Sequence, residues 1–215
     1  MKKRRVLSVV LAASMFAMLL TGCGGGNQGS AEGSQAAAIG QGVAEAESCI
    51  KIGVSGTPDL DPAIVNTGSS LIAAINIYDT LIFPSNEADE GVIPRVAEDW
   101  TISEDGLTYT FNLKKGIKFH NGDELTASDV VYSMDRLLTI GEGYAYIFTS
   151  YVEPGTTVAV DDYTVEFHLK QAYGPFINAL VRLYILNEDE VKANTQSAGN
   201  YGENGDYGRT YLLTT

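Results

Sequence analysis

The sequence FHNGDELTASD, residues 119–129, is the chain's densest group of ionisable side chains. It contains His120, one of only two histidines, together with the carboxylates of Asp123, Glu124 and Asp129. A histidine among carboxylates can ligate zinc or transfer protons in general acid–base catalysis. Either chemistry requires these side chains to converge on one point. The elements on both sides of the group therefore decide between a reactive site and a structural segment.

The residues before this group predict strands and turns. Apolar and polar side chains alternate over 107–114, which is typical of a strand with one buried face. Residues 117–119 form a second predicted strand, and this puts His120 at the end of that strand. Asn121 and Gly122 tolerate positive φ, so they predict a turn directly after it.

The residues after it predict a helix. Thr126 stands where a helix N-cap is expected, and Asp129 follows three residues later in a pattern close to a capping box. Apolar residues then recur at helical spacing over 130–138. Asp123 and Glu124 lie just before this helix, where the helix dipole favours negative charge. The segment is therefore interpreted as scaffold, with no catalytic residue and no metal ligand.

The remaining patterns alternate between strands and helices, which suggests an α/β fold. Residues 157–160 and 163–169 predict a hairpin whose His168 faces solvent. Pro175 fits the first turn of a helix, and the Gly-rich stretch 194–209 predicts a surface-exposed loop. Residues 50–54 predict a strand that runs through a loop into a helix over 69–81, with Leu71, Ile72, Ile75, Ile77 and Tyr78 on its apolar face.

Residues 1–22 have the character of a targeting segment. Four basic residues at positions 2–5 precede an apolar run of about fifteen residues, whereas a membrane-spanning helix needs about twenty. The run ends in LTGC, which resembles the lipobox of bacterial lipoproteins. That resemblance implies cleavage before Cys23 and lipidation of its thiol, which would hold the protein at a membrane without spanning it. An ordinary cleaved signal with an incidental cysteine is the alternative.

Residues 23–48 are rich in Gly, Ser, Gln and Ala, so they predict a flexible linker. Without residues 1–22, Lys plus Arg falls from 14 to 10 against 27 Asp plus Glu, a net charge of about −17. This charge makes nucleic acids and anionic lipid headgroups poor partners. With Cys23 lipidated, Cys49 has no intramolecular partner, and we interpret it as a small apolar residue before the first strand.

Residues 94–136, PRVAEDWTISEDGLTYTFNLKKGIKFHNGDELTASDVVYSMDR, resemble the signature region of the bacterial extracellular solute-binding proteins of family 5. These are the peptide-binding and nickel-binding components of ABC importers. The resemblance implies an α/β fold of the type II periplasmic-binding-protein kind, here incomplete. Residues 49–87 and 192–215 would belong to the first lobe, and 88–191 to an appended mixed α+β subdomain. Family members are much longer, so we expect a truncated chain without the second lobe.

The resemblance also implies a ligand site and a function. Val65, Asn66, Thr67 and Gly68 match the segment that lines the family's cleft, and Tyr144 matches a tyrosine near the peptide backbone. A packed loop aromatic is the other interpretation of Tyr144. We expect a monomeric, lipid-anchored binding protein at the outer face of the cytoplasmic membrane, neither an enzyme nor cofactor-dependent. It would capture oligopeptides or dipeptides and deliver them to a permease and its ATPase, although half a cleft should bind weakly.

Two other function classes stay open at the level of sequence. One is a metal-dependent surface enzyme centred on His120 and the acids near it. The other is a lipoprotein that senses or adheres rather than imports. The sequence contains no nucleotide-binding, metalloprotease, hydrolase or thiol-redox motif. It does not name the ligand, which could be an oligopeptide, a dipeptide, nickel or a sugar.

Overall fold

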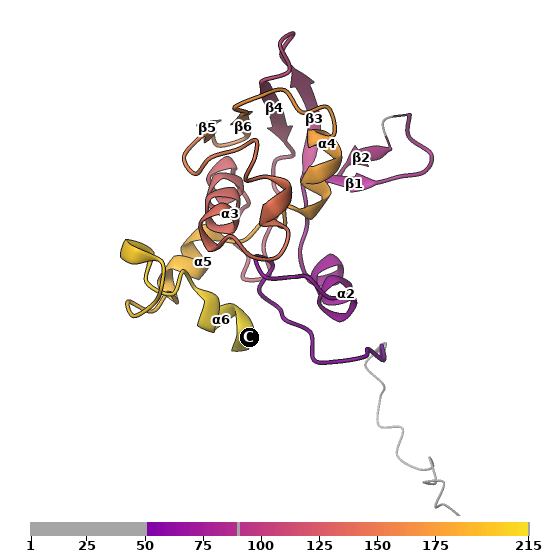
Figure 1. The fold of residues 1–215 in the computed structure, drawn as a ribbon. Helices are drawn as coiled ribbons and strands as arrows, with labels where there is room; N and C mark the ends of the chain where they lie inside the picture. The colour runs from indigo at the N-terminus through magenta and orange to yellow at the C-terminus, as the bar shows by residue number, and fades with distance from the viewer. Residues whose placement is uncertain (1–50, 90, 215) are drawn as a thin grey trace, which may run out of the picture. The chain divides into compact units, whose positions relative to one another are not determined.

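The computed structural model describes residues 51–89 and 91–214 (Figure 1). The predicted targeting segment and linker, with Cys23 and Cys49, lie outside these residues. Within the described part, no helix is long and apolar enough to span a membrane.

A four-stranded antiparallel sheet forms the main layer of the described part. Its strands are β3 (Ala97–Ile102), β4 (Thr108–Leu113), β5 (Thr157–Asp161) and β6 (Thr164–His168), in the spatial order β3-β4-β6-β5. On β4 the alternate residues Tyr109, Phe111 and Leu113 are buried, which confirms the predicted strand. β5 and β6 form the predicted hairpin, and His168 is exposed at its end.

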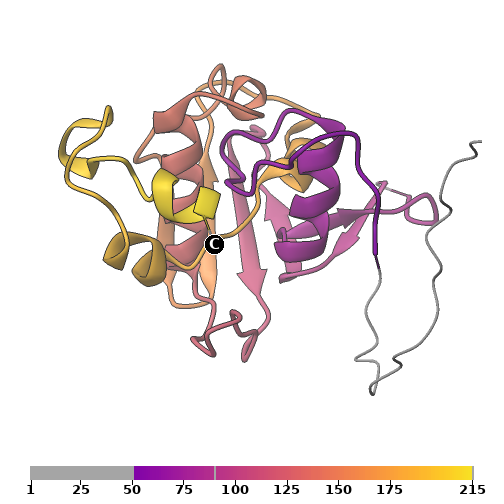
Figure 2. The ribbon, with the colours of Figure 1, turned by 90° about the horizontal axis from the view of Figure 1, so that it is seen from below.

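The helix α3 (Ala127–Ile140) packs on β5 and β6 (Figure 2). Its start confirms the predicted cap, because the Thr126 N–H donates to Asp129 Oδ2 at 2.8 Å. Asp129 Oδ1 accepts the Glu188 N–H at 2.9 Å, which joins the start of α3 to the start of α5 (Glu188–Ala193). Burial raises the pKa of Asp129, although these hydrogen bonds favour its charged form.

The helix predicted over 69–81 forms as α2 (Gly68–Ile77), but only Leu71 and Tyr78 of its predicted apolar face pack against buried residues, and both are only partly buried. The Ser70 hydroxyl accepts the Asp59 N–H at 2.9 Å, so the preceding loop lies against this side of the helix. Only small side chains permit that approach, and this is why the prediction from apolar spacing was wrong. The buried residues are Ser69, Ser70 and Ala74, whereas Ile72, Ile75 and Ile77 are between 40% and 45% exposed.

Two of the predicted strands do not form. Residues 51–54 are exposed and pair with no strand among the described residues. Residues 117–119 contribute only an isolated bridge, from Lys118 to Glu124, so His120 lies in a turn rather than at the end of a strand. A strand needs a neighbour for its backbone hydrogen bonds, and local alternation of side chains does not provide one.

The remaining elements are short. β1 and β2 pair antiparallel, and Pro175 directly precedes α4, as the sequence predicts for a helix beginning there. The full set is β1 (Ile82–Pro84), β2 (Val92–Pro94), η1 (Ala145–Ile147), α4 (Phe176–Ala179), η2 (Leu180–Arg182), η3 (Gly202–Asn204) and α6 (Arg209–Thr214).

The Gly-rich stretch 194–209 was predicted as a surface-exposed loop, and this is wrong for its last part, since residues 205–208 are buried. The Asp206 carboxylate organises this part by accepting the N–H groups of Gln196 at 2.8 Å and Thr210 at 3.0 Å. Burial alone would raise the pKa of Asp206, but the hydrogen bonds outweigh it and lower the pKa. Such a stretch has no periodicity, so the sequence alone does not reveal its burial.

Arg136 is the largest fully buried side chain, and it holds three distant segments together. Its Nη1 and Nη2 donate to the two carboxylate oxygens of Asp61, both at 2.7 Å, and its Nε donates to the Tyr207 carbonyl at 2.7 Å. The Ala63 N–H also donates to Asp61 Oδ1, at 3.0 Å. The two side chains of the ion pair are only 1% and 0% exposed, so salt and water screen this pair very little.

Arg136→Met should destabilise the fold strongly, because it leaves the Asp61 carboxylate buried without its partner. We expect a loss of about 3–5 kcal/mol in the free energy of unfolding, measured by urea denaturation. The matched control is Lys170→Met, which removes a cation from an exposed pair with Glu153 at 3.2 Å. That control should cost at most about 1 kcal/mol. Equal losses in the two variants would contradict the role given to Arg136.

Candidate functional site

The residues predicted to contact a ligand come from two distant segments that lie together in the structure. Tyr144 packs against a small cluster made of Val65, Ala74 and Tyr184. Val65 is fully buried, so no part of this residue is accessible to a solute and it supports the segment from inside the protein. Residues 66–68 are exposed at the start of α2.

The side chain of Thr67 is already in use as the N-cap of α2. Its Oγ1 accepts the Ser70 N–H at 3.2 Å and lies 2.8 Å from Ser70 Oγ. The groups that remain available to a solute are therefore the Asn66 side chain, the exposed backbone of residues 66–68 and the half-buried ring of Tyr144. Exposed backbone beside an aromatic ring can hold an extended peptide through main-chain hydrogen bonds and apolar contact.

A glycine sets the distance between the two segments. Gly143 has φ +53, and a Cβ at this position would lie 2.7 Å from the Ala63 carbonyl oxygen. A side chain would therefore meet both an unfavourable backbone conformation and a steric clash. Because Tyr144 follows Gly143 and Val65 lies two residues after Ala63, this close approach places Tyr144 beside the segment that precedes α2.

Arg182, at the end of η2, adds a cation that the sequence analysis did not predict. Its guanidinium carbon lies 4.9 Å from the centre of the Tyr144 ring, a cation–π arrangement. The ring of Tyr146, which is 70% exposed, lies 6.5 Å from the ring of Tyr144. No sequence pattern links Arg182 to Tyr144, because only the tertiary fold brings η2 to the loop before η1.

Glu124 lies in the loop before α3 and makes hydrogen bonds across that loop. Its Oε1 accepts the Gly116 N–H at 2.9 Å and the Tyr163 hydroxyl at 2.8 Å. These two hydrogen bonds, with that from Tyr163 the larger effect, lower the pKa of Glu124. Glu124 therefore has specific hydrogen-bond partners across the loop in addition to its position before the helix.

Asp123 likewise has partners of its own. Its Oδ2 accepts side-chain N–H groups from Asn121 at 2.7 Å and Asn187 at 3.0 Å. The carboxylates near His120 thus hold different parts of the loop rather than meet at one point. Among residues 51–89 and 91–214, no three His, Cys, Asp or Glu side chains are grouped so that they could hold a metal ion.

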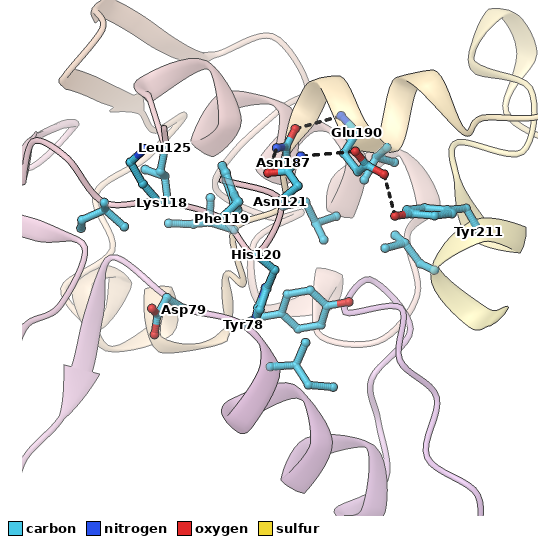
Figure 3. Close-up of a pocket in the computed structure, with 16 residues that line it drawn as sticks. Tyr78, Asp79, Lys118, Phe119, His120, Asn121, Leu125, Asn187, Glu190 and Tyr211 are labelled. Atoms are coloured by element: carbon cyan, nitrogen blue, oxygen red, sulfur yellow. Dashed lines mark hydrogen bonds between the residues drawn. The ribbon is translucent and has the colours of Figure 1, made fainter. Parts of the chain in front are cut away.

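His120 instead lines a cavity of about 270 Å³, together with Tyr78, Phe119 and other side chains (Figure 3). The walls are largely apolar, and the polar groups at the rim bond to each other. Glu190 accepts the Tyr211 hydroxyl at 2.9 Å and an Asn121 side-chain N–H at 3.3 Å. This cavity therefore offers apolar surface but few free polar groups for chemistry.

The hydroxyl of Tyr78, beside the same cavity, donates to the Leu60 carbonyl at 2.9 Å. Burial, with a smaller contribution from the Asp61 carboxylate, raises the pKa of Tyr78 to about 12. Tyr78 is therefore a neutral structural donor at physiological pH and not an acid or base for catalysis.

Comparison with known proteins points to one family. Residues 91–210 match the family model described as bacterial extracellular solute-binding proteins, family 5 Middle. Among curated proteins, the chain is 36% identical over 141 residues to the dipeptide-binding protein of Escherichia coli strain K12, covering 57% of this chain and 26% of that protein. It is 32% identical over 136 residues to di/tripeptide-binding protein 1 of Pseudomonas aeruginosa, covering 56% and 25%.

Solved structures give the same fold. The periplasmic binding protein DppA of Helicobacter pylori, in complex with the peptide STSA, matches with a TM-score of 0.54 and 32% identity, over 62% of this chain and 30% of that one. The substrate-binding domain of an oligopeptide ABC transporter from Bacillus anthracis matches with a TM-score of 0.54 and 31% identity, over 65% and 30%. The chain spans about a quarter of the length of the curated relatives it matches.

Gly143→Ala should loosen the contact between the loop before η1 and the segment before α2. The positive φ alone costs a non-glycine residue about 1–2 kcal/mol, and the close contact with the Ala63 carbonyl adds to this. Urea denaturation should show a loss of at least this size. Gly174→Ala is the control, since a Cβ at position 174 would meet no atom within 4 Å and the effect should stay within about 0.5 kcal/mol. If Gly143→Ala leaves the free energy of unfolding unchanged, the close contact between Gly143 and Ala63 does not require a glycine.

Tyr163→Phe should raise the pKa of Glu124 toward its ordinary value, because the variant removes the hydroxyl that favours the carboxylate. A lowered pKa in the folded state contributes stability above the unfolded-state pKa, and this is lost as pH falls through the folded-state pKa. The variant should therefore be less stable than the wild type at neutral pH, and this difference should shrink as pH falls through the pKa of Glu124. Carbon-detected NMR titration of the carboxyl measures the pKa. Tyr146→Phe is the control, because it removes a tyrosine hydroxyl elsewhere and should leave the pKa of Glu124 unchanged. If Tyr163→Phe also leaves this pKa unchanged, the Tyr163 hydroxyl is not what lowers it.

Proposed function

The chain belongs to family 5 of the bacterial extracellular solute-binding proteins, and on this premise we propose that it is the peptide-binding component of an ABC importer. It would capture oligopeptides or dipeptides outside the membrane and deliver them to a permease whose energy comes from an ATPase. The curated relatives named above are a dipeptide-binding and a di/tripeptide-binding protein, and this supports a short peptide as the solute. In this proposal the protein binds and releases its solute without chemical change.

The observation that carries the proposal is the contact between Tyr144 and the segment that leads into α2. The two segments are fixed together by the close approach of Gly143 to Ala63, and they present exposed backbone beside an aromatic ring. Main-chain groups recognise any peptide irrespective of sequence, which suits a binding protein for varied peptides. We assign residues 66–68 and Tyr144 to peptide contact, with the buried Val65 supporting Tyr144 from the cluster beneath it.

The proposed setting is the outer face of the cytoplasmic membrane. We propose that Cys23 carries the lipid anchor and that residues 23–48 separate the anchor from the binding body, which would act as a monomer. Acyl chains bind membranes by about 0.8 kcal/mol per buried methylene, so a lipidated Cys23 needs no spanning helix. Within the body, we assign 49–87 and 192–215 to the first lobe and 88–191 to the appended subdomain.

Tyr144→Ala should weaken peptide binding by about ten-fold, because aromatic side chains at contact surfaces often contribute more than about 1 kcal/mol. Isothermal titration calorimetry of the full-length protein with a set of di- and tripeptides measures the affinity. Tyr146→Ala is the matched control, since it removes an exposed tyrosine from the same loop and should leave the affinity unchanged.

Three outcomes bear on the proposed function itself. Saturable binding of peptides by the wild-type protein supports it. Saturable binding of only a nickel salt or a sugar would replace the peptide by that solute. No binding of any of these solutes would overturn the proposal.

A further inference from the structure

A second cavity, of about 210 Å³, has an unusual charge for this chain. It lies between α2, β1 and η2, and its lining includes two arginines, Arg95 and Arg182, with apolar walls such as Leu71 and Ile75. No Asp or Glu is among the described residues that line it. The whole chain has 27 acidic against 14 basic residues, so a cavity with cations and no carboxylate is a local exception.

The two arginines differ in whether a carboxylate of the protein already neutralises their charge. Arg95 is paired with Asp79, and its guanidinium lies 5.0 Å from the centre of the Phe83 ring. Arg182 has no carboxylate at ion-pair distance among the described residues, and its guanidinium lies over the ring of Tyr144, at 4.9 Å. The other three arginines in the described part of the chain are all paired with carboxylates. Arg182 is therefore the arginine whose charge is available to an anion.

Tyr184 offers a second donor at the same place. The residue lines the cavity and is only 4% exposed, yet its O–H donates to no acceptor among the described residues. Burial raises the pKa of Tyr184, and the Arg182 guanidinium opposes part of this increase, first by hydrogen bonding to the phenol oxygen and then by its charge. Buried hydroxyls nearly always donate a hydrogen bond in folded proteins, so an O–H without an acceptor, beside a cation without a carboxylate, suggests an absent acceptor.

We propose that this cavity binds a carboxylate of the captured peptide, with Arg182 as its cation and Tyr184 as its hydroxyl donor. The inference rests on the proposed function and adds to it a solute class, peptides that place an anionic group here. A guanidinium and a hydroxyl can together hold both oxygens of a carboxylate, and the apolar walls from α2 fit the aliphatic part of the same residue. Because Arg182 also lies on Tyr144, the cavity adjoins the proposed peptide-contact surface.

The carboxylate could come from an acidic side chain or from the free C-terminus, and paired peptides distinguish the two. Calorimetry of the full-length protein compares Ala-Glu-Ala with Ala-Gln-Ala, and Ala-Ala-Ala with its C-terminal amide. Wild-type protein should prefer the carboxylate in at least one pair by about ten-fold or more, as expected for a charge-assisted hydrogen bond. Arg182→Ala should abolish that preference, and Tyr184→Phe should reduce it while leaving the fold intact.

The control is Lys170→Ala, which removes the same charge from an exposed pair and should keep the full preference. Arg182→Lys tests geometry, since it keeps the charge but loses the planar guanidinium and should retain only part of the preference. If the wild-type protein binds peptides but shows no preference in either pair, or if Arg182→Ala keeps it, the cavity is not a carboxylate site. If the wild-type protein binds no peptide at all, the proposed function fails first and this inference fails with it.

Discussion

The buried ion pair between Arg136 and Asp61 is the contact on which the described fold depends. Removing two charges from water costs several kcal/mol per ion, and the pair recovers this only if its remaining donors and acceptors are satisfied. Here the guanidinium donates to three oxygens and the carboxylate also accepts the Ala63 N–H. Since Asp61 precedes α2, Arg136 lies on α3 and Tyr207 lies near the C-terminal end, their geometry determines how these segments meet.

The same constraint extends to the candidate site through consecutive backbone contacts. Asp61 fixes Ala63 by a hydrogen bond, and the Ala63 carbonyl is the group against which Gly143 packs. Tyr144 follows Gly143, and Val65 follows Ala63 by two residues, so each step of the chain transmits the position of the ion pair. Asp61 and Arg136 therefore shape the proposed peptide-contact surface although both are buried. In this region the packing of the core and the position of the proposed contact residues are therefore determined together.

The predictable parts of the fold were those encoded within a few neighbouring residues. The alternation of β4 and the cap formed by Thr126 and Asp129 need only local sequence, and both predictions were confirmed. The errors concern partners far along the chain: residues 51–54 lack a neighbouring strand, and 205–208 are buried by contacts with the body. For the site, the family resemblance supplied 65–68 and Tyr144, whereas Arg182 becomes visible only once η2 lies beside the loop before η1.

Arg182 is a cation without a carboxylate partner among the described residues, in a chain that is strongly acidic overall. The chain has a large acidic excess, and the other three described arginines, Arg95, Arg136 and Arg209, are each paired with a carboxylate. A guanidinium is weakly hydrated and stable over an aromatic ring, so Arg182 can remain without a carboxylate partner. The acidic surface repels anions at a distance, but ionic strength screens this beyond about 8–10 Å. At contact distance the local cation decides, so an overall acidic protein can still select an anionic group in a cavity that holds no carboxylate of its own.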